Sequence, residues 1–231
     1  GEAQEDSFGR SVSIDSDGDR VAVAAFRNDG TASNAGHVRI YTYDTTAPTV
    51  SSVTSTTANG SYNVDDVIAV TVTFNEAVTV TGTPQLTLET GSTDAVVNYS
   101  SGSGGTTLTF NYTIASGHVS SDLDYKATSS LALNSGTIRD GAGNNATLTL
   151  ASPGASNSLG ANKALVVDGV LPTVSSVTST TGNGTKKVGD VLAITVTFSE
   201  NVTVSGTPQL TLETGGTDAV VNFSSGSGGT T

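Results

Sequence analysis

The feature that most constrains the fold is an internal repeat with a period of 124 residues. Residues 48–107 match residues 172–231 at this constant offset, and 48 of the 60 aligned positions are identical. A period of this length is that of a whole domain, because solenoid repeats span roughly 20–50 residues. We therefore expect two tandem modules: the first at 45–170, and the second at 171–231, which corresponds to the N-terminal half of the first.

Within each copy, apolar residues alternate with small polar residues, which is the period of a β-strand. In VIAVTVTFNEAVTV (67–80), Ile68, Val70, Val72 and Phe74 fall on one side, and the segment returns as VLAITVTFSENVTV (191–204). Strands are expected at 49–55, 67–74, 84–89, 95–99, 107–114, 131–133, 146–150 and 163–167, with turn sequences between them. Seven or eight short strands without an amphipathic helix favour an all-β, two-sheet sandwich.

Composition limits the partners of the chain. With 21 acidic and nine basic side chains the net charge is −12, which repels nucleic acid and anionic lipid. Cysteine is absent, so disulfides and thiolate metal sites are excluded, and oxygen-ligated cations such as calcium are the natural candidates for added stability. No apolar run approaches the roughly 18 residues of a membrane helix. The chain ends at GSGGTT, where the first copy continues into LTFNYTIA, so we expect a segment of a longer polypeptide.

Residues 1–44 form a separate β-segment in this interpretation, with strands expected at 7–14, 20–26 and 37–44. Phe8-Gly9, the strand 21–25 and GHVRIY (36–41) resemble one blade of the FG-GAP, integrin-like β-propeller family. Ala24-Ala25-Phe26 stands where that family usually has Gly-Ala-Pro. The resemblance implies a propeller-blade-like segment that needs further blades to close a ring.

Residues 47–231 carry a more specific resemblance. The segments TFNEAVTV, GTPQLTLETG, GTIRDGAGN and NKALVVDG are similar to the bacterial Ig-like tandem repeats of large surface adhesins and secreted repeat proteins. The resemblance implies an Ig-like sandwich that works as a spacer or adhesive module outside the cell, often with calcium at domain junctions.

The sequence does not indicate an enzyme. A serine triad needs a nucleophile activated by histidine, and the two histidines, His37 and His118, accompany no nucleophile-elbow motif. The glycine-rich stretch 101–105 lacks the lysine and the following helix that hold phosphates. The Asp65-Asp66 pair is Gly189-Asp190 in the second copy, as expected of solvated turn residues.

Glu76 is the unusual residue of the long strand. It has the parity of Phe74 and Val78, so an uninterrupted strand would bury its carboxylate, at a cost of several kcal/mol for an unpaired charge. Either the strand bulges and turns Glu76 outward, or a cation lies beside it. A polar hinge at 43–48 precedes the first strand of the module. Sandwich topology brings the end of the 67–80 segment near Asp44 in this hinge, and the loop at 140–144 can lie at the same end.

These residues predict calcium sites at the module junctions. The repeat maps Asp44 onto Asp168 and Glu76 onto Glu200, so the hinge and strand-end carboxylates recur at the second junction. A weaker calcium candidate is Asp15-Ser16-Asp17-Gly18-Asp19, where Asp15, Asp17 and Asp19 alternate as in calcium loops. It lacks the downstream glutamate, and Asp-Gly between strands is typical of a hairpin turn, which is the favoured interpretation.

We therefore expect a non-enzymatic extracellular repeat protein, secreted or at the cell surface, that serves as an adhesin stalk or surface-filament subunit. Its expected partners are neighbouring copies of itself or adjacent modules, and its candidate targets are a surface glycan or protein. One alternative is an accessory binding module of a larger secreted hydrolase. Another is a filament assembled by strand exchange, because half a sandwich exposes a sheet edge and half a core.

Overall fold

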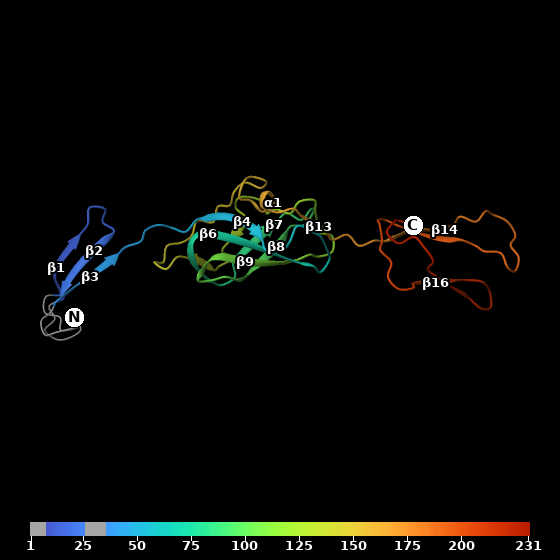
Figure 1. Ribbon diagram of the computed structural model, residues 1–231, viewed down its shortest axis with the longest axis horizontal. Coiled ribbons are helices and arrows are strands. Elements are labelled where there is room, and N and C mark those ends of the chain that lie inside the picture. Colours follow the sequence, from blue (N-terminus) through green and yellow to red (C-terminus); the bar gives the residue numbers. More distant parts are fainter. Residues whose placement is uncertain (1–7, 26–35) are drawn as a thin grey trace. The chain divides into compact units, whose positions relative to one another are not determined.

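The computed structural model describes residues 8–25 and 36–231. Its contacts divide the chain into two compact units, Gly1–Gly169 and Val170–Thr231. Figure 1 shows strands throughout the chain and one short helix, so the predicted all-β fold class is confirmed. No helix of the described residues is long and apolar enough to cross a membrane.

The first three strands form an antiparallel sheet of their own. They are β1 (Phe8–Ile14), β2 (Arg20–Ala25) and β3 (His37–Thr42), in the order β1-β2-β3. Only Val23 and Ala25 on the middle strand are buried, whereas all of β1 is exposed. The three predicted strands of this segment are confirmed, and the ends of the predicted ranges at residues 7 and 26 lie outside the described residues.

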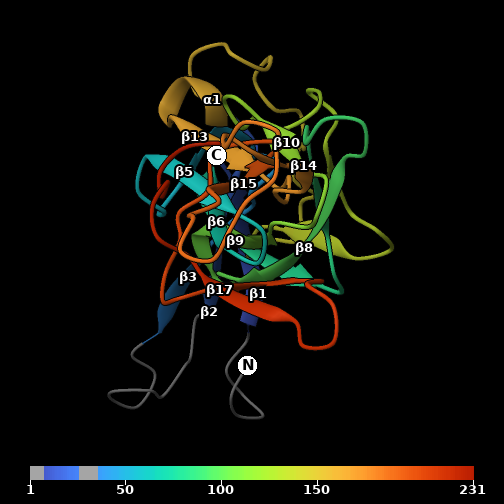
Figure 2. The same cartoon turned by 90° about the vertical axis from the view of Figure 1, so that its right-hand side faces the viewer.

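The first module, drawn in cyan to yellow in Figure 1 and Figure 2, contains one large sheet, one small sheet and a helix. The large sheet has the order β11-β7-β8-β9-β6-β12, with β4 also paired to β6. In the small sheet, of order β10-β13-β5, β13 runs parallel to β5. The elements are β4 (Val50–Ser55), β5 (Gly60–Asn63), β6 (Val67–Thr81), β7 (Gln85–Leu88), β8 (Ala95–Ser101), β9 (Gly105–Thr113), β10 (Val119–Ser120), β11 (Leu131–Ala132), β12 (Thr137–Arg139), α1 (Leu159–Asn162) and β13 (Leu165–Asp168).

The long strand β6 organises the core of this module. Residues 67–73 pair with 113–107 of β9 in antiparallel register, and 79–81 pair with 139–137 of β12. The alternation predicted from the sequence is confirmed, because the two inward-facing rows are fully or almost fully buried. They are Ile68, Val70, Val72 and Phe74 on β6, and Leu108, Phe110, Tyr112 and Ile114 on β9 and just beyond it.

Several predicted boundaries were wrong. The strand expected at 67–74 continues to Thr81, because its end gains a new partner in β12. Residues 146–150 form no strand: one parallel bridge joins Thr49 to Thr147, while Leu150 packs in the core. The helix α1 was not expected, since it has only four residues; its N-cap is Ser158, whose Oγ accepts a hydrogen bond from the Ala161 amide.

The second unit repeats the hairpins of the first module. It contains β14 (Val174–Ser179) paired with β15 (Ile194–Phe198), and β16 (Gln209–Leu212) paired with β17 (Ala219–Asn222). The side-chain bond from Gln209 to Asn222, 3.0 Å, repeats that from Gln85 to Asn98, 2.9 Å. Near-identical sequence therefore gives these two strand pairings in both copies, although β15 is shorter than β6 and residues 184–187 form no strand equivalent to β5.

Candidate metal site

The strand β6 is irregular at the position of Glu76. Its ladder with β9 runs in register as far as Thr73, opposite Thr107, and resumes at Val78, opposite Gly105, so β6 advances five residues while β9 advances two. Within this bulge Phe74 and Val78 remain buried, and Glu76 is half-buried. The bulge considered from the sequence is confirmed, and it turns the Glu76 carboxylate away from the apolar core.

The start of β4 is fixed to the bulge by two hydrogen bonds. The Thr49 amide donates to Oδ1 of Asn75 at 2.7 Å, and the Asn75 amide donates to the carbonyl of Thr49 at 3.0 Å. Pro48, next to Thr49, is buried, and its carbonyl accepts a hydrogen bond from the Thr147 amide at 2.8 Å. These contacts hold the hinge that precedes β4 close to Glu76.

Asp140 lies in the tight turn that follows β12, and its carboxylate is buried. Its Oδ1 accepts hydrogen bonds from the amides of Gly143, at 2.7 Å, and Asn144, at 2.8 Å. Burial acts to raise the pKa of Asp140, but the hydrogen bonds from the Asn144 side chain and from the turn amides outweigh it, so the pKa is lowered. Asp140 is thus a fixed, ionised carboxylate.

Asn144 joins this turn to the hinge. Its Nδ2 lies 2.7 Å from Oδ2 of Asp140, 3.0 Å from the carbonyl of Asp44 and 3.2 Å from the carbonyl of Thr46. The Thr46 amide in turn donates to Oδ1 of Asp44 at 2.9 Å. Asn144 was not singled out from the sequence; the signal for it is its place in the DGAGN turn that contributes Asp140.

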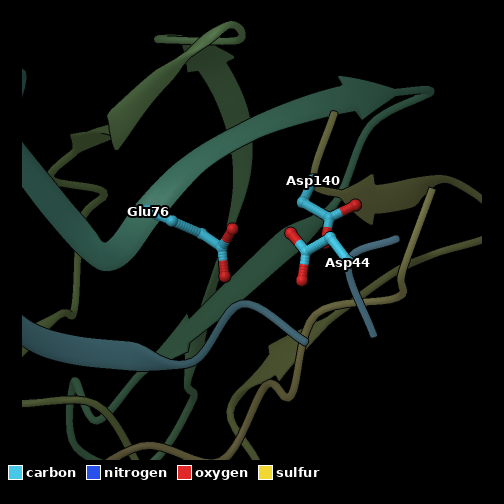
Figure 3. Close-up of side chains that lie close together, drawn as sticks. All are labelled: Asp44, Glu76 and Asp140. Carbon is cyan, nitrogen blue, oxygen red and sulfur yellow. The ribbon is translucent and has the colours of Figure 1, made fainter. Parts of the chain in front are cut away.

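Three carboxylates converge at this point. One oxygen from each of Asp44, Glu76 and Asp140 lies within 4.8 Å of the other two, and Figure 3 shows the three side chains turned toward one another. Burial raises the pKa of Glu76, and the negative charges of Asp44 and Asp140 raise it further. A site with three carboxylate ligands fits a hard divalent cation such as calcium, which binds six to eight oxygens.

The structure brings together three of the five residues predicted to bind calcium at junctions. Asp168 ends β13, and its backbone pairs with Val119 and Asn63. Glu200 is half-buried in the second unit, and its Oε1 has no hydrogen-bond partner among the described residues. Because Asp168 and Glu200 belong to different units, their meeting stays a prediction.

The aspartate loop between β1 and β2 forms a hairpin turn, as the sequence favoured. Oδ1 of Asp15 accepts hydrogen bonds from the amides of Gly18, at 2.9 Å, and Arg20, at 3.3 Å. Gly18 has a positive φ of 77°, as the turn requires. Calcium binding by Asp15, Asp17 and Asp19 stays a prediction.

The two histidines differ in their surroundings. His118 stacks on Tyr112 at a ring-centroid distance of 5.8 Å, and its Nδ1 lies 2.9 Å from the Tyr112 hydroxyl. This arrangement gives His118 a structural role at the end of β9. His37 begins β3, and its Nε2 is buried without a hydrogen-bond partner in the described part of the chain.

Comparison with known proteins finds one family model that matches the module that carries this site. Residues 44–153 match the family model of the bacterial Ig-like domain. This match supports the predicted Ig-like repeat, and it spans all three carboxylates of the cluster. The FG-GAP resemblance of residues 1–44 lies outside the match and stays a prediction. No curated protein and no solved structure matches the chain.

Proposed function

We propose that this chain is part of an extracellular structural or adhesive repeat protein whose Ig-like modules are stiffened by calcium at their junctions. The observation that carries the proposal is the convergence of Asp44, Glu76 and Asp140 where the chain enters the module. Bacterial Ig-like domains are typically non-catalytic and usually occur in extracellular or surface proteins. An adhesin stalk or a surface-filament subunit is the role that fits these features best.

The cluster connects three parts of the module that are distant in sequence. Asp44 belongs to the hinge, Glu76 to the bulge of β6, and Asp140 to the turn after β12. Without a cation their charges repel one another, as the raised pKa of Glu76 reflects. A calcium ion held by these carboxylates would replace repulsion with attraction and fix the hinge, so that a flexible connection becomes a rigid one.

The repeat extends this proposal along the protein. Asp168 and Glu200 stand 124 residues after Asp44 and Glu76, so the same hinge and strand-end carboxylates are available at the next junction. A cation at every junction would turn a string of modules into a rod. A stalk needs this property to present an adhesive surface away from the cell.

The proposal is tested by thermal unfolding of the full chain in calcium and in EDTA. Calcium is expected to raise the unfolding midpoint, because an ion that binds the folded state stabilises it by about 2.7 kcal/mol at a hundred times its dissociation constant. Glu76→Gln is expected to abolish this increase. Asp65→Asn is the matched control, since it removes one negative charge at an exposed turn outside the cluster and keeps a residue suited to its φ of 70°.

In EDTA, Glu76→Gln is expected to have the opposite effect on stability to the one that it has in calcium. The substitution removes one of three mutually repelling charges, so the calcium-free variant is expected to be at least as stable as the calcium-free wild type. A calcium-dependent midpoint that survives in Glu76→Gln, or that is lost equally in Asp65→Asn, would place the ion elsewhere.

The pH dependence gives a second test. The pKa of Glu76 is raised from 4.5, so its stabilising contribution is present when it is protonated and is lost as the pH rises through the folded pKa. The pKa of Asp140 is lowered from 3.8, so its contribution is present above that pH and is lost as the pH falls. In EDTA, acidification toward the Glu76 pKa should therefore raise the midpoint, whereas in calcium it should lower it, because protons compete with the ion.

A further inference from the structure

A groove opens on the first module where β8 and β9 separate. The two strands are directly paired at Tyr99, opposite Phe110. Residues 95–98 of β8 pair instead with β7, and residues 111–113 of β9 pair with β6. In the described part of the chain these two segments form no ladder with each other. The groove between them has a volume of about 520 Å³, which lies within the range of small-ligand sites.

Strand alternation gives the groove an apolar base and polar walls. The lining residues on the core side are buried and largely apolar: Ala95, Val97 and Tyr112. The lining residues that alternate with them are exposed: Val96, Asn98, Asn111 and Thr113. The groove therefore presents two amides, a hydroxyl and one apolar side chain to solvent.

The two amides have hydrogen-bonding groups to spare. The Nε2 of Gln85 donates to Oδ1 of Asn98 at 2.9 Å, which orients the Asn98 amide and leaves its Nδ2 without a partner in the described part of the chain. The side chain of Asn111 makes no hydrogen bond to any described residue. A carboxamide has two donor hydrogens and an acceptor oxygen, so each of these side chains can bond to neighbouring hydroxyl groups of one ligand.

His118 adds an oriented donor to the lining. Its Nδ1 lies 3.4 Å from the Ala115 amide and 2.9 Å from the Tyr112 hydroxyl. Because a backbone amide can only donate, Nδ1 is the acceptor and the ring N–H stands on Nε2. Within the described residues this Nε2 has no hydrogen-bond partner, so the ring can donate to a ligand in the groove.

The charge of the groove limits the ligands that it can bind. Asp94 is the acidic residue of the described lining, which contains no lysine or arginine. Its Oδ2 pairs with Lys126 and its Oδ1 is buried, so Asp94 presents no free oxygen to a cation. An anionic ligand would find no cationic partner, and the net charge of −12 would repel it. The lining therefore favours a neutral ligand.

We propose that this groove binds a neutral saccharide, with Asn98, Asn111 and His118 as its polar contacts. Sugar hydroxyls both donate and accept, which matches two carboxamides beside an imidazole N–H. Val96 is 57% exposed, and a sugar ring that covers it with its C–H groups would bury apolar surface. The inference rests on the adhesive part of the proposed function and gives the chemical class of its target.

An extended peptide is the competing occupant, because it could add a strand to either edge of the groove. At the closed end, however, Tyr99 and Phe110 are ladder partners, so the two strands lie about 4.8 Å apart. A third strand between them would need about twice this separation. A sugar ring can bond to the exposed amides from the solvent side without entering the ladder.

The test is a titration of the nitrogen-15-labelled full chain, followed by the NMR shifts of its amides, in calcium and in EDTA. The probes are the methyl glycosides of glucose and galactose, together with the matching uronides, in which the terminal hydroxymethyl group is a carboxylate. We expect saturable, millimolar binding of at least one neutral glycoside, with shifts confined to 94–100, 111–113 and 118. Its uronide should bind at least about ten-fold more weakly.

A pair of asparagine variants locates the site. Asn111→Ala removes a groove amide whose side chain bonds to no described residue, and Asn63→Ala is the matched control at an exposed position of β5 outside the groove. Asn111→Ala should weaken binding at least about ten-fold, since a lost hydrogen bond to a ligand costs on the order of 1 kcal/mol or more. Asn63→Ala should leave binding unchanged, and both variants should keep the wild-type unfolding midpoint.

Several results would overturn the proposal. These are the absence of localised shifts with both neutral glycosides, equal or tighter binding of the uronides, and equal effects of the two variants. Shifts in the groove with the extended peptide VTVTV but not with the glycosides would overturn it in favour of a strand. Absence of saccharide binding in a chain whose unfolding still depends on calcium would refute this inference and leave the calcium-stiffened junction standing.

Discussion

The two copies allow one core substitution to be tested in two environments. Leu86 and Leu210 occupy the same place in the sequence QLTL, which occurs in both copies. Leu86 is completely buried and stands between Val97 on β8 and Leu131 on β11. Leu210 is half-buried, opposite Val221, and the described part of the second unit has no strand equivalent to β11. We predict that Leu86→Ala destabilises the protein much more than Leu210→Ala.

The magnitudes follow from this difference in burial. A fully buried Leu→Ala substitution costs about 2–5 kcal/mol, since it loses apolar contacts and leaves a cavity. Leu86 is enclosed on both sides, so we take about 3 kcal/mol, which lowers the midpoint of a module of this size by roughly 10–15 °C. Leu210 loses less buried surface and leaves no closed cavity, so its substitution should cost under about 1 kcal/mol.

The measurement is equilibrium urea unfolding of the full chain and both variants, followed by tyrosine absorbance and circular dichroism. The transition of the first module should shift to lower urea in Leu86→Ala and stay in place in Leu210→Ala. Equal shifts would show that residues 170–231 bury their apolar face in solution. That result would refute the difference in burial between the two copies.

Three further predictions concern the first module. Burial raises the pKa of Tyr112 to about 12, and burial together with the charge of Asp124 raises the pKa of Tyr125 to about 12. Tyrosines of the unfolded chain ionise near pH 10, so the module should lose stability as the pH rises from about 10 to 12. Tyrosinate absorbance and circular dichroism measure this loss. Gly102→Ala should destabilise the β8–β9 turn by more than about 1 kcal/mol, because the added Cβ would lie 2.1 Å from the carbonyl oxygen of Thr107, at a residue whose φ is 112°. The control is Gly104→Ala, whose Cβ would meet no atom within 4 Å, and thermal melts of the two variants compare the steric cost. Asn144→Ala should lower stability by about 1 kcal/mol, because it removes the hydrogen bonds that join the hinge to the Asp140 turn. The same substitution should weaken calcium binding, which calorimetric titration with calcium measures.

The sequence was sufficient to predict the core because period-two alternation is a local signal. The inward-facing residues are the alternate ones that parity predicts: Ile68, Val70, Val72 and Phe74, and Leu108, Phe110, Tyr112 and Ile114. The same signal stops being informative at Glu76, where β6 bulges and changes partner from β9 to β12. β12 has only three residues, and its pairing depends on where that bulge lies, so the sequence pattern could not reveal it.

The candidate site could be predicted in outline but not in its construction. Sandwich topology placed Asp44, Glu76 and Asp140 at one end of the module, and the structure brings them together. The role of Asn144 could not be predicted, because its side chain bonds to carbonyls about a hundred residues earlier in the chain. Such contacts depend on the closed sandwich and leave no periodic signal in the sequence.

The comparison of the two copies separates local strand pairing from burial and from completion of the site. The β14–β15 and β16–β17 pairings and two side-chain bonds repeat those of the first copy, so local sequence is sufficient for these pairings. Other parts do not recur, because β15 is shorter than β6 and residues 184–187 form no strand equivalent to β5. Burial does not recur, because it depends on the closing half at 108–167. Asp140 also belongs to that closing half, whereas Asp44 and Glu76 precede it. In the first module, the cluster of Asp44, Glu76 and Asp140 is therefore complete only when residues 108–167 have folded onto the earlier strands.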